Sequence, residues 1–142
     1  MSGDGPRQVN EALLDHLQSI FGRLSSVSRV SLFPPNKQEG LVIEFETAAY
    51  PESIGAVRLE VRAYTNGDFH VSYLETHIGE LRQCRFDRHD QNHNSRDHFH
   101  PLPDASTGDA QDREFPTDLT TVIREVVLPW VETRFGDLWD DA

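Results

Sequence analysis

Cysteine, lysine and long apolar runs are almost absent from this chain of 142 residues. The single cysteine, Cys84, excludes an intramolecular disulfide and a zinc site built on several thiolates. No stretch of about 18 apolar residues is present, so the sequence predicts no membrane-spanning helix. The first eight residues carry Asp4 and have no apolar centre, and we therefore expect no signal peptide. Together these absences predict a cytoplasmic protein that does not associate with membranes.

Lys37 is the only lysine, whereas the other 12 of the 13 basic residues are arginines. The 24 acidic residues give a net charge of −11 and are spread along the chain. A carboxylate-rich surface with little lysine resembles that of proteins from salt-in halophiles, and we expect a halophilic protein. An ordinary acidic cytosolic protein encoded by a GC-rich genome is the alternative. The charge disfavours a long nucleic-acid track, because affinity for phosphates falls steeply with salt.

The hydrophobic periodicity predicts one α+β domain over residues 1–142. We expect an N-terminal helix, a mainly antiparallel sheet of about five strands, and a C-terminal helix packed on that sheet. Pro129 is expected to kink or end the second helix near Trp130. The expected segments, in order, are a helix over 8–24, a strand meander over 27–88, a His-rich loop and linker over 89–116, a helix over 117–135 and an acidic tail over 136–142.

Alternation within the expected strands divides the sheet into an apolar and a polar face. The turn Asn66-Gly67-Asp68 predicts a tight hairpin, so neighbouring strands should be antiparallel. In the last expected strand Cys84 and Phe86 share one face, and Arg85 and Asp87 share the other. Further polar residues are candidates for the same face as Asp87, namely Arg58, Glu60, Arg62, His70 and Ser72.

The segment from residue 85 to residue 100 is the most informative part of the chain. Histidine changes its charge near neutral pH, and neutral imidazole is a common metal ligand. Such a cluster at the end of a strand therefore predicts a site. The segment holds four of the seven histidines with arginines and aspartates among them, namely His89, His93, His98 and His100, Arg85, Arg88 and Arg96, and Asp87, Asp90 and Asp97.

Metal binding is one interpretation of this segment. His89, His93, His98 and His100 with nearby carboxylates suit zinc, manganese or nickel, and an open coordination position would activate water. Their spacing permits a metal site but does not match a defined metal motif.

Metal-free acid–base catalysis on an RNA phosphodiester, with no cofactor, is a second interpretation. It requires a base, an acid and a cation. Here His98 and His100 would form the acid–base pair, Arg85 would bind the phosphate, and Asp87 would orient one imidazole.

The remaining residues of the segment would support binding in that mechanism. The candidate binding residues are His89, His93, Arg88, Arg96 and Phe99. Phe99 would serve either as a packing anchor or as a surface on which a base stacks. A third interpretation is that the segment is a solvated loop, or a non-catalytic interaction module whose histidines only structure that loop.

The pattern Arg85-Phe86-Asp87, then His89, then His98-Phe99-His100-Pro101 resembles the TumE toxin family. That family has an Arg-Trp-Asp strand end, a Pro-His-His and a Phe-Pro-His-His-x-His loop. In this chain Phe86 stands in the place of the tryptophan, and Asn92-His93-Asn94 stands in the place of the Pro-His-His.

The resemblance implies a small toxin that is paired with a DNA-binding antitoxin. It also implies growth inhibition, through cleavage of RNA or action on another phosphate-containing substrate. The site residues that it indicates are Arg85, Asp87, His89, His98 and His100.

Overall fold

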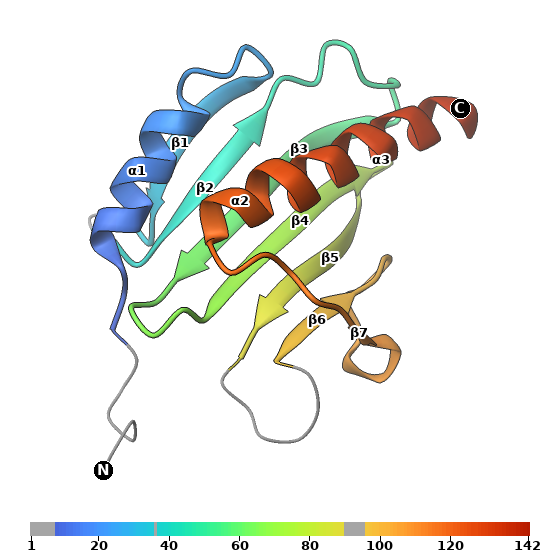
Figure 1. Ribbon diagram of the computed structural model, residues 1–142. Helices are drawn as coiled ribbons and strands as arrows, with labels where there is room; N and C mark the ends of the chain where they lie inside the picture. The colour runs from blue at the N-terminus through green and yellow to red at the C-terminus, as the bar shows by residue number, and fades with distance from the viewer. Residues whose placement is uncertain (1–7, 36, 90–95) are drawn as a thin grey trace.

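The computed structural model describes residues 8–35, 37–89 and 96–142, and it confirms the α+β fold (Figure 1). Seven strands form one antiparallel sheet in the order of the chain, β1-β2-β3-β4-β5-β6-β7. The strands are β1 (Val27–Phe33), β2 (Gly40–Phe45), β3 (Ile54–Ala63), β4 (Phe69–His77), β5 (Glu80–Arg88), β6 (Asp97–His100) and β7 (Gln111–Asp112). The helical elements are α1 (Glu11–Phe21), the 3-10 turn η1 (Thr107–Asp109), α2 (Leu119–Val122), the π-helical turn η2 (Ile123–Val127) and α3 (Leu128–Asp140).

Local sequence accounts for the central hairpins of the sheet. Gly67 adopts a φ of 95° in the turn between β3 and β4, a conformation that glycine reaches without the steric cost of a Cβ. Asn66 accepts a hydrogen bond from the Asp68 amide through its side-chain oxygen, which closes the same turn. The predicted antiparallel meander over β1 to β5 is confirmed.

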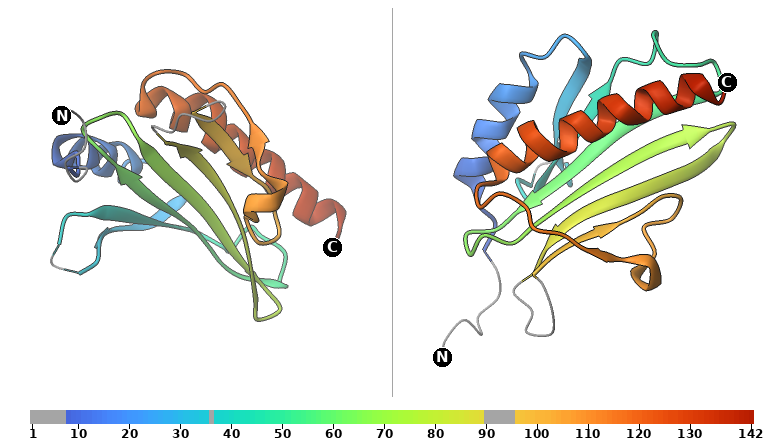
Figure 2. Two further views of the ribbon diagram at one scale, coloured as in Figure 1. Left: turned by 90° about the horizontal axis from the view of Figure 1, so that it is seen from below. Right: turned by 45° about the vertical axis from the view of Figure 1, so that its right-hand side comes forward.

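Both long helical segments lie on one side of the curved sheet, and the opposite face carries no described α-helix (Figure 2). Helix α1 begins after Asn10, whose side-chain oxygen accepts a hydrogen bond from the Leu13 amide, so it is shorter than the expected 8–24. Alternate strand residues face the helices and form one core. The core includes Leu14, Leu17 and Phe21 of α1, Leu59, Val61, Val71, Tyr73, Cys84 and Phe86 of the sheet, and Val122, Ile123, Val127 and Val131 of the C-terminal helical segment.

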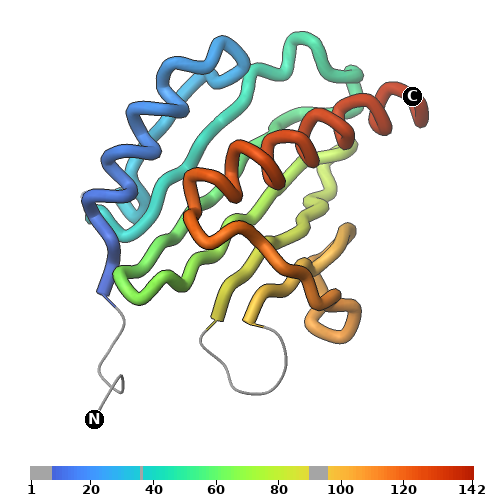
Figure 3. Tube along the Cα trace, in the orientation of Figure 1, coloured from blue at the N-terminus to red at the C-terminus, as the bar shows by residue number. Residues whose placement is uncertain are grey.

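The expected count of about five strands is too low, because β6 and β7 lie within the segment 89–116 that was expected to be a loop. The tube in Figure 3 shows residues 97–100 lying along the edge of β5. Strand β6 has only four residues and is followed by Pro101, so its local signal is weak. Pairing with β5 makes it a strand, and that pairing is a tertiary contact.

The second helical segment also differs from expectation at both ends. It begins after Asp118, which caps it by accepting from the Thr121 amide, and it continues to Asp140. The helix therefore does not end near Trp130, and most of the expected acidic tail is helical. Pro129 is tolerated because the π-helical turn η2 immediately precedes α3 and rearranges the hydrogen bonds at that point.

None of the helices in the described parts of the chain is long and apolar enough to cross a membrane.

Candidate functional site

A carboxylate on β5 is the centre of the polar face. Asp87 has no exposed surface, and four side chains point nitrogen atoms at its two oxygens. His70 lies with Nδ1 2.8 Å from Oδ1, and Arg85 donates from Nε to Oδ2 at 2.7 Å. His100 places Nε2 3.0 Å from Oδ2, and His89 places Nε2 3.5 Å from the same oxygen. This group of five residues is called the Asp87 cluster below.

The strand register explains how residues distant in sequence meet here. Asp87 lies opposite His70 on β4 and opposite His98 on β6, while Arg85 lies opposite His100. Alternate residues of adjacent paired strands share a face, so all five project from the side of the sheet without helices. The four residues predicted to be catalytic, Arg85, Asp87, His98 and His100, are thus brought side by side.

The environment shifts the proton equilibria of two members of the Asp87 cluster. Burial alone would raise the pKa of Asp87, but hydrogen bonds and charges from His70 and Arg85 outweigh it and lower the pKa to about 2. Asp87 is therefore ionised at neutral pH. Burial lowers the pKa of His89, with the charge of His70 adding to this effect and that of Asp87 opposing it. A lowered pKa keeps the His89 imidazole neutral at pH 7.

Arg85 lies between two pockets on this face. The first, about 380 Å³, is called the β3–β4 pocket and is lined by Glu60, Arg62, His70, Ser72 and Arg85. The second, about 430 Å³, is called the β6–β7 pocket and is lined by Arg85, His89, His98, His100, Thr107, Ala110 and Asp112. Both walls are largely polar, and a single guanidinium is common to them.

His98 and His100 occupy different environments. His98 is partly exposed and places Nε2 3.3 Å from Oδ1 of Asp112 on β7. The side chain of His100 is only 7% exposed, and its Nδ1 lies 3.5 Å from the Ser106 carbonyl oxygen, on the side of the ring away from Asp87. Hence His98 faces the β6–β7 pocket more openly, and His100 chiefly braces the carboxylate.

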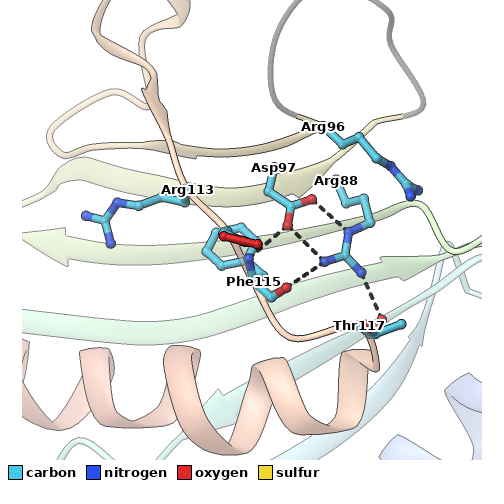
Figure 4. Close-up of a pocket in the computed structure, with 7 residues that line it drawn as sticks. Arg88, Arg96, Asp97, Arg113, Phe115 and Thr117 are labelled. Atoms are coloured by element: carbon cyan, nitrogen blue, oxygen red, sulfur yellow. Dashed lines mark hydrogen bonds and ion pairs between the residues drawn. The ribbon is translucent and has the colours of Figure 1, made fainter.

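Arg88 lies on the helix-facing side of β5 and is buried. It forms a bidentate ion pair with Asp97, at 2.8 and 2.9 Å, and donates to the carbonyls of Phe115 and Thr117 (Figure 4). It also donates to the carbonyl of Pro116. The Phe115 amide in turn donates to Asp97. These contacts fix the chain that leads into α2, so Arg88 has a structural role and points away from the Asp87 cluster.

Of the other predicted binding residues, His89 belongs to the cluster, Phe99 and Arg96 lie away from it, and His93 lies outside the described residues. Phe99 faces the core, with its ring centroid 5.0 Å from that of Phe86, an arrangement that supports the packing alternative. Arg96 is exposed and lies 3.8 Å from Asp68. His93 and Asp90 lie outside the described residues.

Within the described residues, one group of three side chains has the donor set and spacing for a metal ion. One ligand atom each from His70, Asp87 and His89 lies within 4.8 Å of the others. His98 and His100, two of the predicted metal ligands, do not belong to this group.

His70 is the residue that the sequence interpretation placed on the polar face but did not assign to the site. Two signals together point to it. The Asn66-Gly67 turn fixes the register of β3 and β4, and alternation puts His70 on the same face as Asp87. The missing information was the register of β5 against β4, which sets His70 directly opposite Asp87.

The fold and the cluster together define an α+β protein with a candidate acid–base site on the open face of an antiparallel sheet. The family model described as toxin TumE matches residues 13–135, which is most of the chain. The chain therefore belongs to the TumE toxin family. Comparison with curated proteins and with solved structures gives no match. Membership in a toxin family supports a toxin of a toxin–antitoxin module and implies an antitoxin as the candidate partner.

Proposed function

We propose that this protein is a cytoplasmic toxin that cleaves RNA without a metal ion, and that a DNA-binding antitoxin controls it. The observation that carries this proposal is the Asp87 cluster: a buried carboxylate holds two partly exposed imidazoles, His70 and His89, beside one guanidinium, Arg85. An acid, a base and a cation are the groups that phosphodiester transfer needs.

In the proposed step His89 is the base and His70 is the acid. Neutral His89 removes the proton of the ribose 2′-hydroxyl, and the 2′-oxygen attacks the adjacent phosphorus. The bond from phosphorus to the 5′-oxygen breaks, and His70 gives its proton to that oxygen. The products are a 2′,3′-cyclic phosphate and a 5′-hydroxyl, and Arg85 offsets the negative charge that develops on the phosphoryl oxygens.

Asp87 acts through the two rings. Its contact with Nδ1 of His70 fixes that ring and leaves Nε2 for the substrate, and its contact with Nε2 of His89 leaves Nδ1 as proton acceptor. His100 contacts the same carboxylate oxygen, Oδ2, as His89 and Arg85 and helps to hold it in place. His98, on the rim of the β6–β7 pocket, is placed to contact the RNA. The sequence had indicated His98 and His100 as the acid–base pair. Two observations favour His89 and His70 instead: the ion-pair partner of His98 is Asp112, and the side chain of His100 is only 7% exposed.

Cleavage of a short single-stranded RNA by the purified protein in the presence of EDTA tests this proposal. We expect His89→Gln and His70→Gln each to reduce the rate roughly 10²- to 10⁴-fold. His16→Gln is the matched control, because His16 is an exposed histidine of α1. A substrate with 2′-deoxyribose at the cleaved position should remain intact.

Growth on induced expression is the cellular counterpart. Wild-type protein and His16→Gln should slow growth, and His89→Gln, His70→Gln and Arg85→Ala should not. If wild-type protein slows growth while no RNA is cleaved in EDTA, the metal-free ribonuclease is rejected.

The compact His70, Asp87 and His89 group favours one second candidate, a site for a divalent transition metal such as zinc. A stoichiometric metal in protein purified without an affinity tag, lost in His70→Gln and accompanied by activity that EDTA abolishes, would establish that candidate in place of the first.

A further inference from the structure

We propose that the two pockets that meet at Arg85 bind the two nucleosides on either side of one phosphate, and that the β3–β4 pocket selects guanine, so that RNA is cleaved on the 5′ side of guanosine. This inference rests on the proposed ribonuclease function and names its substrate.

The shared arginine sets the position of the phosphate. Arg85 lines both pockets, and its side chain is 35% exposed although its Nε is bound to Asp87. A guanidinium has five N–H donors, so further donors remain for phosphate oxygens. A phosphate bound there has one pocket on each side, and each pocket falls within the usual size of small-molecule sites.

The β3–β4 pocket presents a carboxylate and a guanidinium on neighbouring positions of β3. Glu60 is held by Arg58, whose Nε donates to Oε2 at 2.9 Å, and its side chain is 31% exposed. A carboxylate has about four acceptor positions, so this contact leaves acceptors for a ligand. Arg62, two residues further along the same face, is 36% exposed; its Nη1 lies 4.0 Å from Glu39, and its other N–H groups remain as donors.

Guanine is the base that complements this pair of side chains. Its Watson–Crick edge places two adjacent donors, N1–H and N2–H, beside the acceptor O6, and N7 is a second acceptor. Glu60 can accept from the two donors while Arg62 donates to O6 or N7, the commonest specific contact of arginine with a base. Adenine would turn the N1 lone pair toward the carboxylate, and uracil and cytosine offer it one donor group only.

His70 and His89 set the 5′-to-3′ direction in which the RNA lies across the two pockets. His89 lines the β6–β7 pocket, so the nucleoside there supplies the attacking 2′-hydroxyl. His70 lines the β3–β4 pocket, so the nucleoside there carries the leaving 5′-oxygen. The guanosine in the β3–β4 pocket is therefore the 3′ partner of the cleaved bond.

Cleavage of four dinucleotides, ApG, GpA, ApA and ApI, tests both the selection of guanine and the direction of the RNA. ApG should be cleaved roughly 10-fold or more faster than ApA, because one bidentate base contact contributes about that factor or more. ApI, whose hypoxanthine base lacks the 2-amino group, should lie between them. Equal rates for ApG and ApA would overturn guanine selection, and a preference for GpA over ApG would overturn the direction.

Two matched variants test whether Glu60 is the residue that selects guanine. Glu60→Gln should bring the ApG to ApA ratio close to one, because an amide cannot accept from two adjacent donors. Glu44→Gln should keep the wild-type ratio, because Glu44 lies on the neighbouring strand β2 and lines neither pocket. If Glu60→Gln keeps the ratio, Glu60 does not read the base.

Measurements of binding distinguish a failure of this inference from a failure of the proposed function. If none of the four dinucleotides is cleaved, the proposed ribonuclease function is rejected. Titration of the protein with their 2′-deoxy forms still tests whether the β3–β4 pocket binds guanine. Tighter binding of 2′-deoxy ApG than of 2′-deoxy ApA, lost in Glu60→Gln, would support a guanine site, and equal binding of the two would overturn it.

Discussion

Among the described residues, two carboxylates have no exposed surface, and their partners differ. Glu75 on β4 lies on the helix-facing side, where Arg82 and Arg134 donate to it and the Tyr73 hydroxyl donates at 2.6 Å. Asp87 on β5 lies on the open side with three histidines and one arginine. The partners of Glu75 come from β4, β5 and α3, whereas those of Asp87 line two pockets.

The difference lies in which partners can exchange a proton at neutral pH. Arginine stays protonated, and burial together with Glu75 raises the pKa of Tyr73, so the Glu75 network is electrically fixed. That network attaches helix α3 to the sheet. Histidine is the side chain that ordinarily exchanges protons near neutrality, so under the proposed function the Asp87 cluster would pass protons to and from the RNA. A buried carboxylate is therefore structural in one place and, under the proposed function, part of an acid–base site in the other, because its partners differ.

The largest difference between the two carboxylates is expected in the rate of RNA cleavage. Asp87→Asn should reduce RNA cleavage roughly 100-fold or more, because both imidazoles lose the charge that orients them. Glu75→Gln should retain most of the wild-type rate when it is assayed well below its unfolding temperature. Equal losses in the two variants, with both proteins folded by circular dichroism, would remove the functional distinction.

The free energy of unfolding should depend more on Glu75 than on Asp87, which is the opposite of the order expected for activity. Glu75→Gln leaves two arginines facing each other in a largely buried site and should cost about 3 kcal/mol or more of unfolding free energy. Asp87→Asn should cost about 1–3 kcal/mol, because Arg85 is partly solvated and keeps part of its hydration. Urea denaturation measures both. A greater loss in Asp87→Asn would contradict this assignment of roles.

Lowering the pH should weaken the contribution of Asp87 to the free energy of unfolding over a defined range. The pKa of Asp87 is lowered to about 2 in the folded protein, so its stabilising effect is present above the unfolded value of about 4 and is lost as pH falls toward about 2. The unfolding free energies of wild type and Asp87→Asn should therefore converge by about 2 kcal/mol between pH 6 and pH 2. A constant difference over that range would show that the charge of Asp87 does not stabilise the fold.

The smallest contrast concerns the two arginines that lie three residues apart on β5. Arg88→Lys should cost about 2 kcal/mol, because a lysine cannot keep the bidentate pair with Asp97 and the three carbonyl contacts. Arg85→Lys should change stability by less than about 1 kcal/mol, because its side chain is 35% exposed. Thermal unfolding of the two variants measures this difference.

Much of the framework was predictable from local patterns. Alternation identified five strands and placed Arg85 and Asp87 on the polar face, and helical periodicity located both helices. The length of the second helix was missed, because the effect of Pro129 depends on the π-helical turn before it. Strand β6 was missed because four residues next to a proline carry little intrinsic preference, and it is their pairing with β5 that makes them a strand.

The sequence by itself determined the inventory of the site: which side chains are acidic, basic or able to titrate, and which of them share a face of the sheet. Those properties follow from residue identity and from the two-residue period of a strand. Only the tertiary structure decided that His70 and His89 meet at Asp87, that Arg88 serves the fold, and that Phe99 packs in the core. Register between strands that are distant in sequence is set by the pairing and by the core beneath it, so no local pattern specifies it.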